Sequence, residues 1–192
     1  METLEARLDQ IETEIDREDF RDNTGLGNEV GYYIFDYPAS EELRVREHIR
    51  YLQEKHNPAI KGYELRVFDL YDLMIDLIEE EGLMEACIQM EEEEGLDYLI
   101  SSVWGLMNMD QNDNYFVTYV DEHTPDESVV FITGVGKIFP FVRSHSILNK
   151  MHTVFDRVPV VLFYPGKYDG RTLMLFSEFK DDHYYRAFPL VR

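Results

Sequence analysis

The sequence predicts an α/β protein: a three-layer sandwich with a mainly parallel sheet of about five strands and an added N-terminal helix. Four short apolar runs lack polar alternation, which is typical of strands that are covered on both faces of a sheet. Helical patterns separate these runs, and a shorter run closes the chain, an order that favours crossover connections. The 192 residues, 44% of them apolar, are enough for one domain. We place this domain at residues 25–192, behind a helix at residues 1–24.

The N-terminal segment, residues 3–20, has a narrow apolar stripe on an otherwise charged helix. The stripe consists of residues at steps of four, three and four along the chain: Leu4, Leu8, Ile11 and Ile15. Such a stripe fits either a coiled-coil arm or a helix laid against the domain's own surface. Glycines and asparagines in residues 22–28 then end the helical pattern.

The first two strands are expected at Tyr32–Phe35 and Glu64–Phe68. A helix that ends near Asn57 lies between them, and its apolar face is formed by Leu43, Val45, Ile49 and Leu52. Asp69 directly follows the second strand and can cap the next helix, because its carboxylate can accept hydrogen bonds from the first free N–H groups. Gly82 ends that helix.

Two further helices are expected at Leu83–Glu94 and Leu96–Leu106, with Gly95 between them. The segment from Met107 to His123 is ambiguous. Its Asn and Asp residues indicate a loop, and the apolar residues between Tyr115 and Val120 fit either a strand or a short helix. We favour a helix, because an additional strand would interrupt the alternation of strands and helices.

The stretch Val129–Met151 predicts a buried strand, a glycine loop and a helix in succession. Its first four residues are apolar and mostly β-branched, and a threonine ends the run. Gly134 and Gly136 permit backbone conformations and close approaches that a Cβ would forbid. Pro140 suits the first turn of the following helix, where its missing N–H is not needed.

A fourth buried strand is expected at Val158–Tyr164, followed by a turn at Pro165 and Gly166. The apolar segments Leu173–Phe176 and Tyr184–Val191 are shorter and mixed in composition. The last strand is therefore expected at or near an edge of the sheet.

Polar and glycine residues follow the expected strands at their carboxyl ends. In a parallel sheet these ends meet at one edge, which is where α/β proteins usually bind ligands. We therefore expect this rim to contact a partner or to shape the surface around it. Its candidate residues are Asp36, Asp69, Arg143, His145, Tyr164, Gly166 and Asp169.

The glycine loop could hold an anion or nucleotide through Gly134, Gly136 and Lys137, because free N–H groups at the start of a helix favour negative charge. It does not match a P-loop, in which four residues separate a first glycine from Gly-Lys and then Ser or Thr. Phe131 occupies the position of that first glycine, and Ile138 replaces the hydroxyl residue. The dinucleotide fingerprint also fails, since its third glycine is replaced by a phenylalanine.

No other pattern supports catalysis or metal binding. His145 flanks the apolar side of its helix, as a packed histidine would, and His152 is two turns away, too far to share one metal without outside ligands. Cys87 is the single cysteine and has no activating signature around it. The clusters Asp121–His123 and Asp181–His183 fit loops. We expect no cofactor, no metal and no catalytic residue.

The charge of the chain argues against nucleic acid as a partner. The 18 Lys and Arg against 39 Asp and Glu give a net charge of −21, and no basic run offsets it. The excess fits either solubility or docking onto a basic protein surface. No run of about 18 apolar residues and no signal-peptide pattern is present, so we expect a cytoplasmic protein without membrane contact.

From about Gly25 to the C-terminus the sequence resembles the BrxB family of the bacterial BREX anti-phage systems. The segments that carry the resemblance are GLGNEVGYYIFDYP, VREHIRYL, FDLYDLMIDLIEEEG, VVFITGVGKIFPFVRSHSILN, VVLFYPGKYDG and DDHYYRAFPLV. The resemblance implies a small non-catalytic member of a complex that distinguishes self DNA by methylation and blocks phage replication. It implies no catalytic residues, and the family pattern does not require lysine at position 137.

The resemblance also implies protein partners: the phosphatase-like PglZ first, then the ATPase BrxC, the methyltransferase PglX and the protease-like BrxL. Together with the charge, it predicts an adaptor that docks a larger BREX component through an acidic surface and an apolar patch. The alternative is a degenerate nucleotide or phosphate sensor built on Gly134, Gly136 and Lys137. Direct recognition of DNA is a third hypothesis, which the charge disfavours. The oligomeric state is left open.

Overall fold

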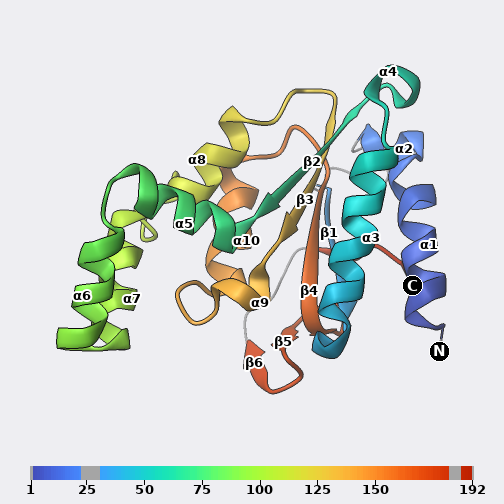
Figure 1. Ribbon diagram of the computed structural model, residues 1–192. Helices are drawn as coiled ribbons and strands as arrows, with labels where there is room; N and C mark the ends of the chain where they lie inside the picture. The colour runs from blue at the N-terminus through green and yellow to red at the C-terminus, as the bar shows by residue number, and fades with distance from the viewer. Residues whose placement is uncertain (1, 23–30, 182–186, 192) are drawn as a thin grey trace.

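The computed structural model of the chain describes residues 2–22, 31–181 and 187–191, and only the backbone of residues 144, 145 and 181. It confirms the predicted α/β class, with helices on both faces of a mainly parallel sheet (Figure 1). The parallel strands lie in the order β2 (Glu64–Asp69), β3 (Ser128–Thr133), β4 (Val160–Tyr168), β1 (Tyr32–Tyr37) and β7 (Phe188–Pro189). Two short antiparallel strands, β5 (Leu173–Leu175) and β6 (Phe179–Asp181), continue from the end of β4.

The strand order makes the sheet doubly wound. The connection from β1 to β2 includes η1 (Ala39–Glu41), α3 (Glu42–Lys55) and α4 (Pro58–Lys61), and α3 covers one face of the sheet (Figure 1). The connections from β2 to β3 and from β3 to β4 run over the opposite face. After β1 the chain crosses towards β2 at one edge of the sheet, and after β4 it continues towards β7 at the other edge. Ligands of doubly wound sheets usually bind in the crevice at such a switch point.

One face of the sheet is covered by α1 (Leu4–Ile15) together with α3. Leu8, Ile11 and Ile15 are buried in one cluster with strand residues such as Phe35, so the apolar stripe of α1 lies against the domain's own surface. The expected helix over residues 3–20 is interrupted, because Arg17 has an extended backbone with φ −67° and ψ 136°. A separate helical turn, α2 (Glu18–Arg21), follows.

The opposite face is covered by three helices: α5 (Leu70–Glu80), α8 (Tyr115–Glu122) and α10 (Ser144–Val154). The apolar part of the ambiguous segment, from Tyr115 to Val120, is therefore helical, as favoured. Asn114 caps α8, because its Oδ1 accepts hydrogen bonds from the backbone N–H groups of Phe116 at 3.1 Å and Val117 at 3.3 Å. Phe116 and Val117 are then completely buried against the sheet.

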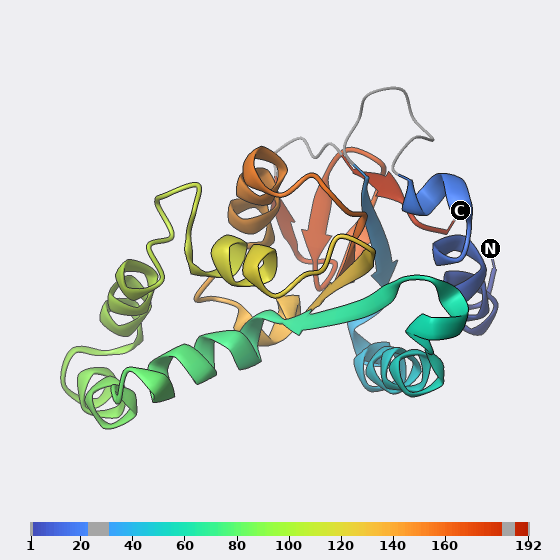
Figure 2. The same cartoon turned by 90° about the horizontal axis from the view of Figure 1, so that it is seen from above.

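The helices α6 (Met84–Glu94) and α7 (Leu96–Leu106) form at the predicted positions and pack against each other as a hairpin. This hairpin projects away from the sheet at the far end of α5 (Figures 1 and 2). Leu99 and Val103 of α7 are buried, whereas no residue of α6 is. The hairpin is thus attached to the core by the buried residues of α7 and by the partly buried Met84, Cys87 and Met90 of α6.

Pro140 does not begin a helix, contrary to the prediction. A four-residue helix, α9 (Val135–Ile138), follows Gly134 directly, and Pro140 lies between α9 and α10. A residue before proline is disfavoured in the helical conformation, and Phe139 is extended, with φ −65° and ψ 133°. The proline therefore separates two helices where one was expected.

The predicted turn at Pro165 and Gly166 is also wrong, because β4 continues through both residues. Pro165 pairs with Tyr37 at the end of β1, and Gly166 pairs with Leu175 in the antiparallel strand β5. The expected start of the last strand at Tyr184 lies outside the described residues. Its described part, β7, is at the edge of the sheet, as predicted. Among the helices that the structure describes, none is long and apolar enough to cross a membrane.

Ion pairs hold α1 against α3 and α4. The carboxylate of Glu12 accepts hydrogen bonds from Lys55 Nζ at 2.6 Å and Lys61 Nζ at 3.1 Å. Lys61 also pairs with Asp16, which accepts a hydrogen bond of 2.8 Å from the Tyr63 hydroxyl. The hydrogen bond from Lys55, with the charge of Lys61, holds the pKa of Glu12 below its ordinary value.

Substitution of Gly166 by alanine is expected to destabilise the domain by about 1–3 kcal/mol, because a Cβ would lie 2.1 Å from the Met174 carbonyl oxygen, which belongs to the backbone of β5. Urea unfolding measures the change. Gly105→Ala is the matched control: nothing lies within 4 Å of its Cβ position in α7, so it should stabilise by about 0.5–1 kcal/mol. Equal stability of both variants would contradict the close approach of β4 and β5.

Substitution of Glu12 by glutamine is expected to lower the free energy of unfolding at pH 7 by a few tenths to about 1 kcal/mol. A carboxylate with a lowered pKa stabilises the fold above its unfolded pKa, and this stabilisation is lost as the pH falls through the folded pKa, below the ordinary value of 4.5. The deficit of Glu12→Gln should therefore shrink on acidification. Glu47→Gln, on the exposed face of α3, removes a carboxylate outside this cluster and is the matched control.

Candidate functional site: the carboxyl rim of the sheet

Asp69, at the end of β2, connects several elements of the rim. Its Oδ1 accepts hydrogen bonds from the backbone N–H groups of Tyr71 at 3.0 Å and Asp72 at 3.2 Å, and so caps α5 as predicted. Its Oδ2 pairs with Lys137 Nζ of α9 at 2.8 Å and lies 3.4 Å from the Thr133 hydroxyl. One carboxylate thus joins β2, β3, α5 and α9.

Gly134 is required by the position of this carboxylate. Its φ of +78° is in the left-handed region, and a Cβ on it would lie only 2.2 Å from Asp69 Oδ1. Gly136 lies inside α9, where a Cβ would approach the Phe176 ring at 3.0 Å and the Pro165 ring at 3.1 Å. Both glycines therefore make room for neighbouring groups of the protein itself, and the anion next to the loop is Asp69.

Lys137, the expected cation of the loop, is paired with two carboxylates. Its Nζ lies 2.8 Å from Asp69 Oδ2 and 2.8 Å from Asp72 Oδ1. Burial lowers the pKa of Lys137, but the hydrogen bonds to the two carboxylates outweigh this effect and raise the pKa above its ordinary value. The lysine is charged at neutral pH, and a phosphate that approached it would be repelled by the two neighbouring carboxylates. The geometry therefore does not favour the nucleotide or phosphate alternative.

The switch point of the sheet holds a small hollow of about 240 Å³. Its lining comes from η1, α3, α9, β4 and the segment after β5: Ala39, Glu42, Arg46, Gly136, Lys137, Pro165 and Phe176. The second cation of the hollow, Arg46, donates a hydrogen bond of 2.8 Å to Glu42. Glu42 also accepts one of 2.6 Å from the Tyr37 hydroxyl. The charges at the usual ligand crevice are thus paired within the chain.

Asp36, at the end of β1, fixes the N-terminal helix to the sheet. Its Oδ1 pairs with the Arg7 guanidinium of α1 at 2.7 Å, and its carbonyl oxygen accepts a second hydrogen bond of 2.8 Å from the same side chain. Its Oδ2 accepts a hydrogen bond of 3.1 Å from the backbone N–H of Tyr168. The carboxylate therefore connects α1, β1 and the extended part of β4.

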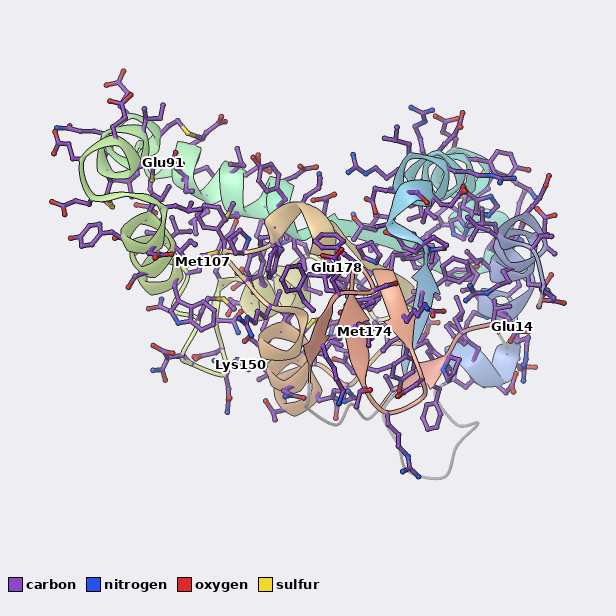
Figure 3. The ribbon with its side chains drawn as sticks, turned by 90° about the horizontal axis from the view of Figure 1, so that it is seen from below. Glu14, Glu91, Met107, Lys150, Met174 and Glu178 are labelled. Carbon is purple, nitrogen blue, oxygen red and sulfur yellow. The ribbon has the colours of Figure 1, made fainter. Side chains whose placement is uncertain are left out.

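A second hollow, of about 260 Å³, lies beside β6 and contains two of the predicted rim residues, Arg143 and Tyr164. Tyr164 is almost completely buried, with 1% of its surface exposed. The remaining lining residues are Phe139, Leu175, Glu178, Phe179 and Lys180, and Glu178 is labelled in Figure 3. The Phe139 and Phe179 rings pack with their centroids 5.1 Å apart and their planes tilted by 36°. This hollow combines aromatic walls with side chains of both charges.

The other predicted rim residues lie apart from these hollows. Gly166 permits the contact between β4 and β5, and Asp169 shapes the turn that follows β4 by accepting hydrogen bonds from the N–H groups of Arg171 at 2.8 Å and Thr172 at 2.7 Å. The backbone of His145 lies in the first turn of α10, but its side chain is outside the description. In the described part of the chain, no group of three or more His, Cys, Asp or Glu side chains is placed to hold a metal.

Two features of the chain were not predicted from the sequence. The aromatic cluster of Phe139, Phe176 and Phe179 forms only when the short strands β5 and β6 fold back towards α9. The other is a charge asymmetry that a count along the sequence reveals: residues 67–136 contain 18 Asp and Glu but no Lys or Arg. This segment includes the projecting hairpin α6–α7.

The fold and the rim define a doubly wound α/β protein with an internally paired carboxyl rim and a projecting helical hairpin. The profile of a protein family described as "BREX protein BrxB" matches residues 66–190 of the chain. A protein of Bacillus cereus (strain H3081.97) with the same description is 45% identical over 191 residues, which cover 100% of this chain and 99% of the relative. A second, from Escherichia coli O9:H4 (strain HS), is 36% identical over 188 residues, which cover 98% of this chain and 92% of the relative.

The chain therefore belongs to the BrxB family and is a component of a BREX system. This confirms the resemblance that the sequence motifs indicated. No solved structure matches the chain significantly.

Magnesium ATP at millimolar concentration is expected to give no binding heat in titration calorimetry, because Lys137 is already paired with Asp69 and Asp72. GTP and cyclic nucleotides are likewise expected to give no binding heat. Lys137→Met and the control Lys167→Met, an exposed lysine of β4, should give the same flat titrations. A heat that Lys137→Met abolishes and Lys167→Met preserves would establish the nucleotide alternative.

Proposed function

We propose that the chain is a non-catalytic adaptor of a BREX phage-defence complex. In this proposal it acts in the cytoplasm, docks a larger component of the system and holds it in the assembly. PglZ is the first candidate for that component, and BrxC, PglX and BrxL are the others. Membership of the BrxB family supports a role in a BREX complex, because both relatives are described as BREX proteins. Their descriptions name no enzymatic activity, which is consistent with an adaptor.

The observation that carries the proposal is the pairing of charges along the rim. An enzyme of doubly wound fold usually places its reactive or ligand-binding groups at the carboxyl ends of its strands. In this chain, Asp36 is bound by Arg7 and a backbone N–H, and Asp69 by Lys137 and the start of α5. These groups serve to hold elements together, which suits a rigid scaffold for protein contacts.

The net charge of the chain favours a protein rather than a nucleic acid as the partner. At −21 the chain repels a phosphate backbone, whereas a basic protein surface would be attracted to it. Electrostatic attraction of this kind weakens when salt shortens the screening length. The proposed docking should therefore be faster at low salt than at high salt.

The affinity-tagged chain is expected to retain purified PglZ on a resin at about 0.15 M salt, after nuclease treatment to remove bridging DNA. PglX, BrxC and BrxL are tested one by one in the same way. An unrelated protein of similar size and acidity serves as the control, because it reports retention by net charge alone. If none of the four components is retained above this control, the adaptor proposal fails.

A further inference from the structure

The surface of the α6–α7 hairpin has an unusual composition. It lies in the middle of residues 67–136, where 18 acidic residues occur without one Lys or Arg. All of the Lys and Arg of the chain lie before or after that segment in the sequence. The acidic charge of the hairpin is therefore not compensated by any basic side chain of its own segment.

The same hairpin exposes large apolar side chains. Ile88 of α6 is 53% exposed, Tyr98 of α7 is 53% exposed, and Leu96 at the start of α7 is 43% exposed. Residues three and four apart are neighbours on a helix surface, so Ile88 is surrounded by Glu85, Glu91 and Glu92. An apolar side chain among carboxylates suits a contact that is both apolar and charged.

The position of the hairpin makes this surface accessible. Figures 1 and 2 show α6 and α7 projecting from the sheet, and Figure 3 shows Glu91 at the outer end, far from Glu178 at the rim and Glu14 of α1. Met84, Cys87 and Met90 of α6 are partly buried against the core, whereas Ile88 is exposed and is not part of that packing. The side of α6 that carries Ile88 is therefore free to serve an external contact.

We propose that the α6–α7 hairpin is the docking surface of the adaptor, and that its partner is a protein surface on which Lys and Arg side chains surround an apolar hollow. Ile88 and Tyr98 insert into the hollow, and the carboxylates around them pair with the basic rim. The inference rests on the proposed adaptor function and adds to it the surface and the chemistry of the partner.

Charge distinguishes this partner from other occupants. A nucleic acid or an anionic lipid surface would be repelled by the hairpin. A second copy of the chain that docked through the same hairpin would bring two acidic hairpins together, with no basic residue from either segment between them. A basic protein surface is the occupant that gains from both the carboxylates and the exposed apolar side chains.

The apolar part of the contact is tested with two double variants that are matched in chemistry. Ile88→Gln with Tyr98→Gln removes the two anchors of the hairpin. Ile60→Gln with Tyr51→Gln changes the same residue types at α4 and α3, where they are 79% and 51% exposed. Glutamine keeps helix propensity, so both variants should fold, which circular dichroism verifies. The ligand is the purified component that the wild-type chain retains.

In surface plasmon resonance, the hairpin variant is expected to bind that component at least about tenfold more weakly, mainly through faster dissociation. The control variant should stay within about twofold of the wild type. Equal affinities of the hairpin variant and the control would overturn the inference, while the adaptor function would stand on the wild-type binding itself.

The charged part is tested by replacing Glu91, Glu92, Glu93 and Glu94 with glutamine. The control replaces exposed acids of α1, α2 and α3 by their amides and changes the net charge equally: Asp9, Glu18, Glu47 and Glu54. The hairpin variant should associate more slowly and show a weaker salt dependence than the control. If both variants slow association equally, the association rate depends on the net charge of the chain and not on the hairpin, and the inference is wrong. If the wild type retains no component, the adaptor proposal itself has failed.

Discussion

The carboxylate of Asp69 is the constraint on which much of the molecule depends. It ends β2 and starts α5 without an intervening loop, because its oxygens satisfy the first N–H groups of the helix while pairing with Lys137. The direction of α5 is therefore set by the sheet. Since α5 carries the α6–α7 hairpin at its other end, the residue that closes the rim also aims the hairpin away from it (Figure 2). Gly134 follows from the same constraint, because only a residue without a side chain leaves space for the carboxylate.

The distribution of charge divides the molecule in two. On the side of α1, α3 and α4, acids and bases alternate and pair, as in the cluster of Glu12, Lys55 and Lys61. On the side of α6 and α7 the charge is acidic alone. The first arrangement holds helices to the sheet, whereas the second contributes nothing to cohesion, since like charges on a hairpin repel one another. A surface that is unfavourable for the isolated chain becomes favourable when an opposite charge covers it, which fits a component built for assembly.

The elements of the fold could be predicted wherever one local pattern dominated. Continuous apolar runs identified β3 and β4, and the carboxylate after β2 identified the cap of α5. Prediction failed where partners distant in sequence decide the conformation. Pro165 and Gly166 resemble a turn locally, but pairing with β1 and β5 keeps them in a strand. Lys137 resembles a phosphate ligand locally, and only the tertiary fold brings Asp69, 68 residues earlier, against it. The candidate rim was therefore located by sequence, but the pairing of its charges was not.

The absence of lysine and arginine between Val67 and Gly136 also determines which chemical reagents can detect this part of the molecule. Trypsin has no cleavage site within the segment, so it releases the hairpin inside one long peptide. Amine-reactive cross-linkers find no lysine there, and a lysine-based map of the assembled complex would leave this surface blank even if it were fully covered. Carboxyl-directed coupling and a glutamate-specific protease, in contrast, have many targets on α6. The chemistry that makes the hairpin suitable for a basic partner thus also decides which probes can reveal the contact.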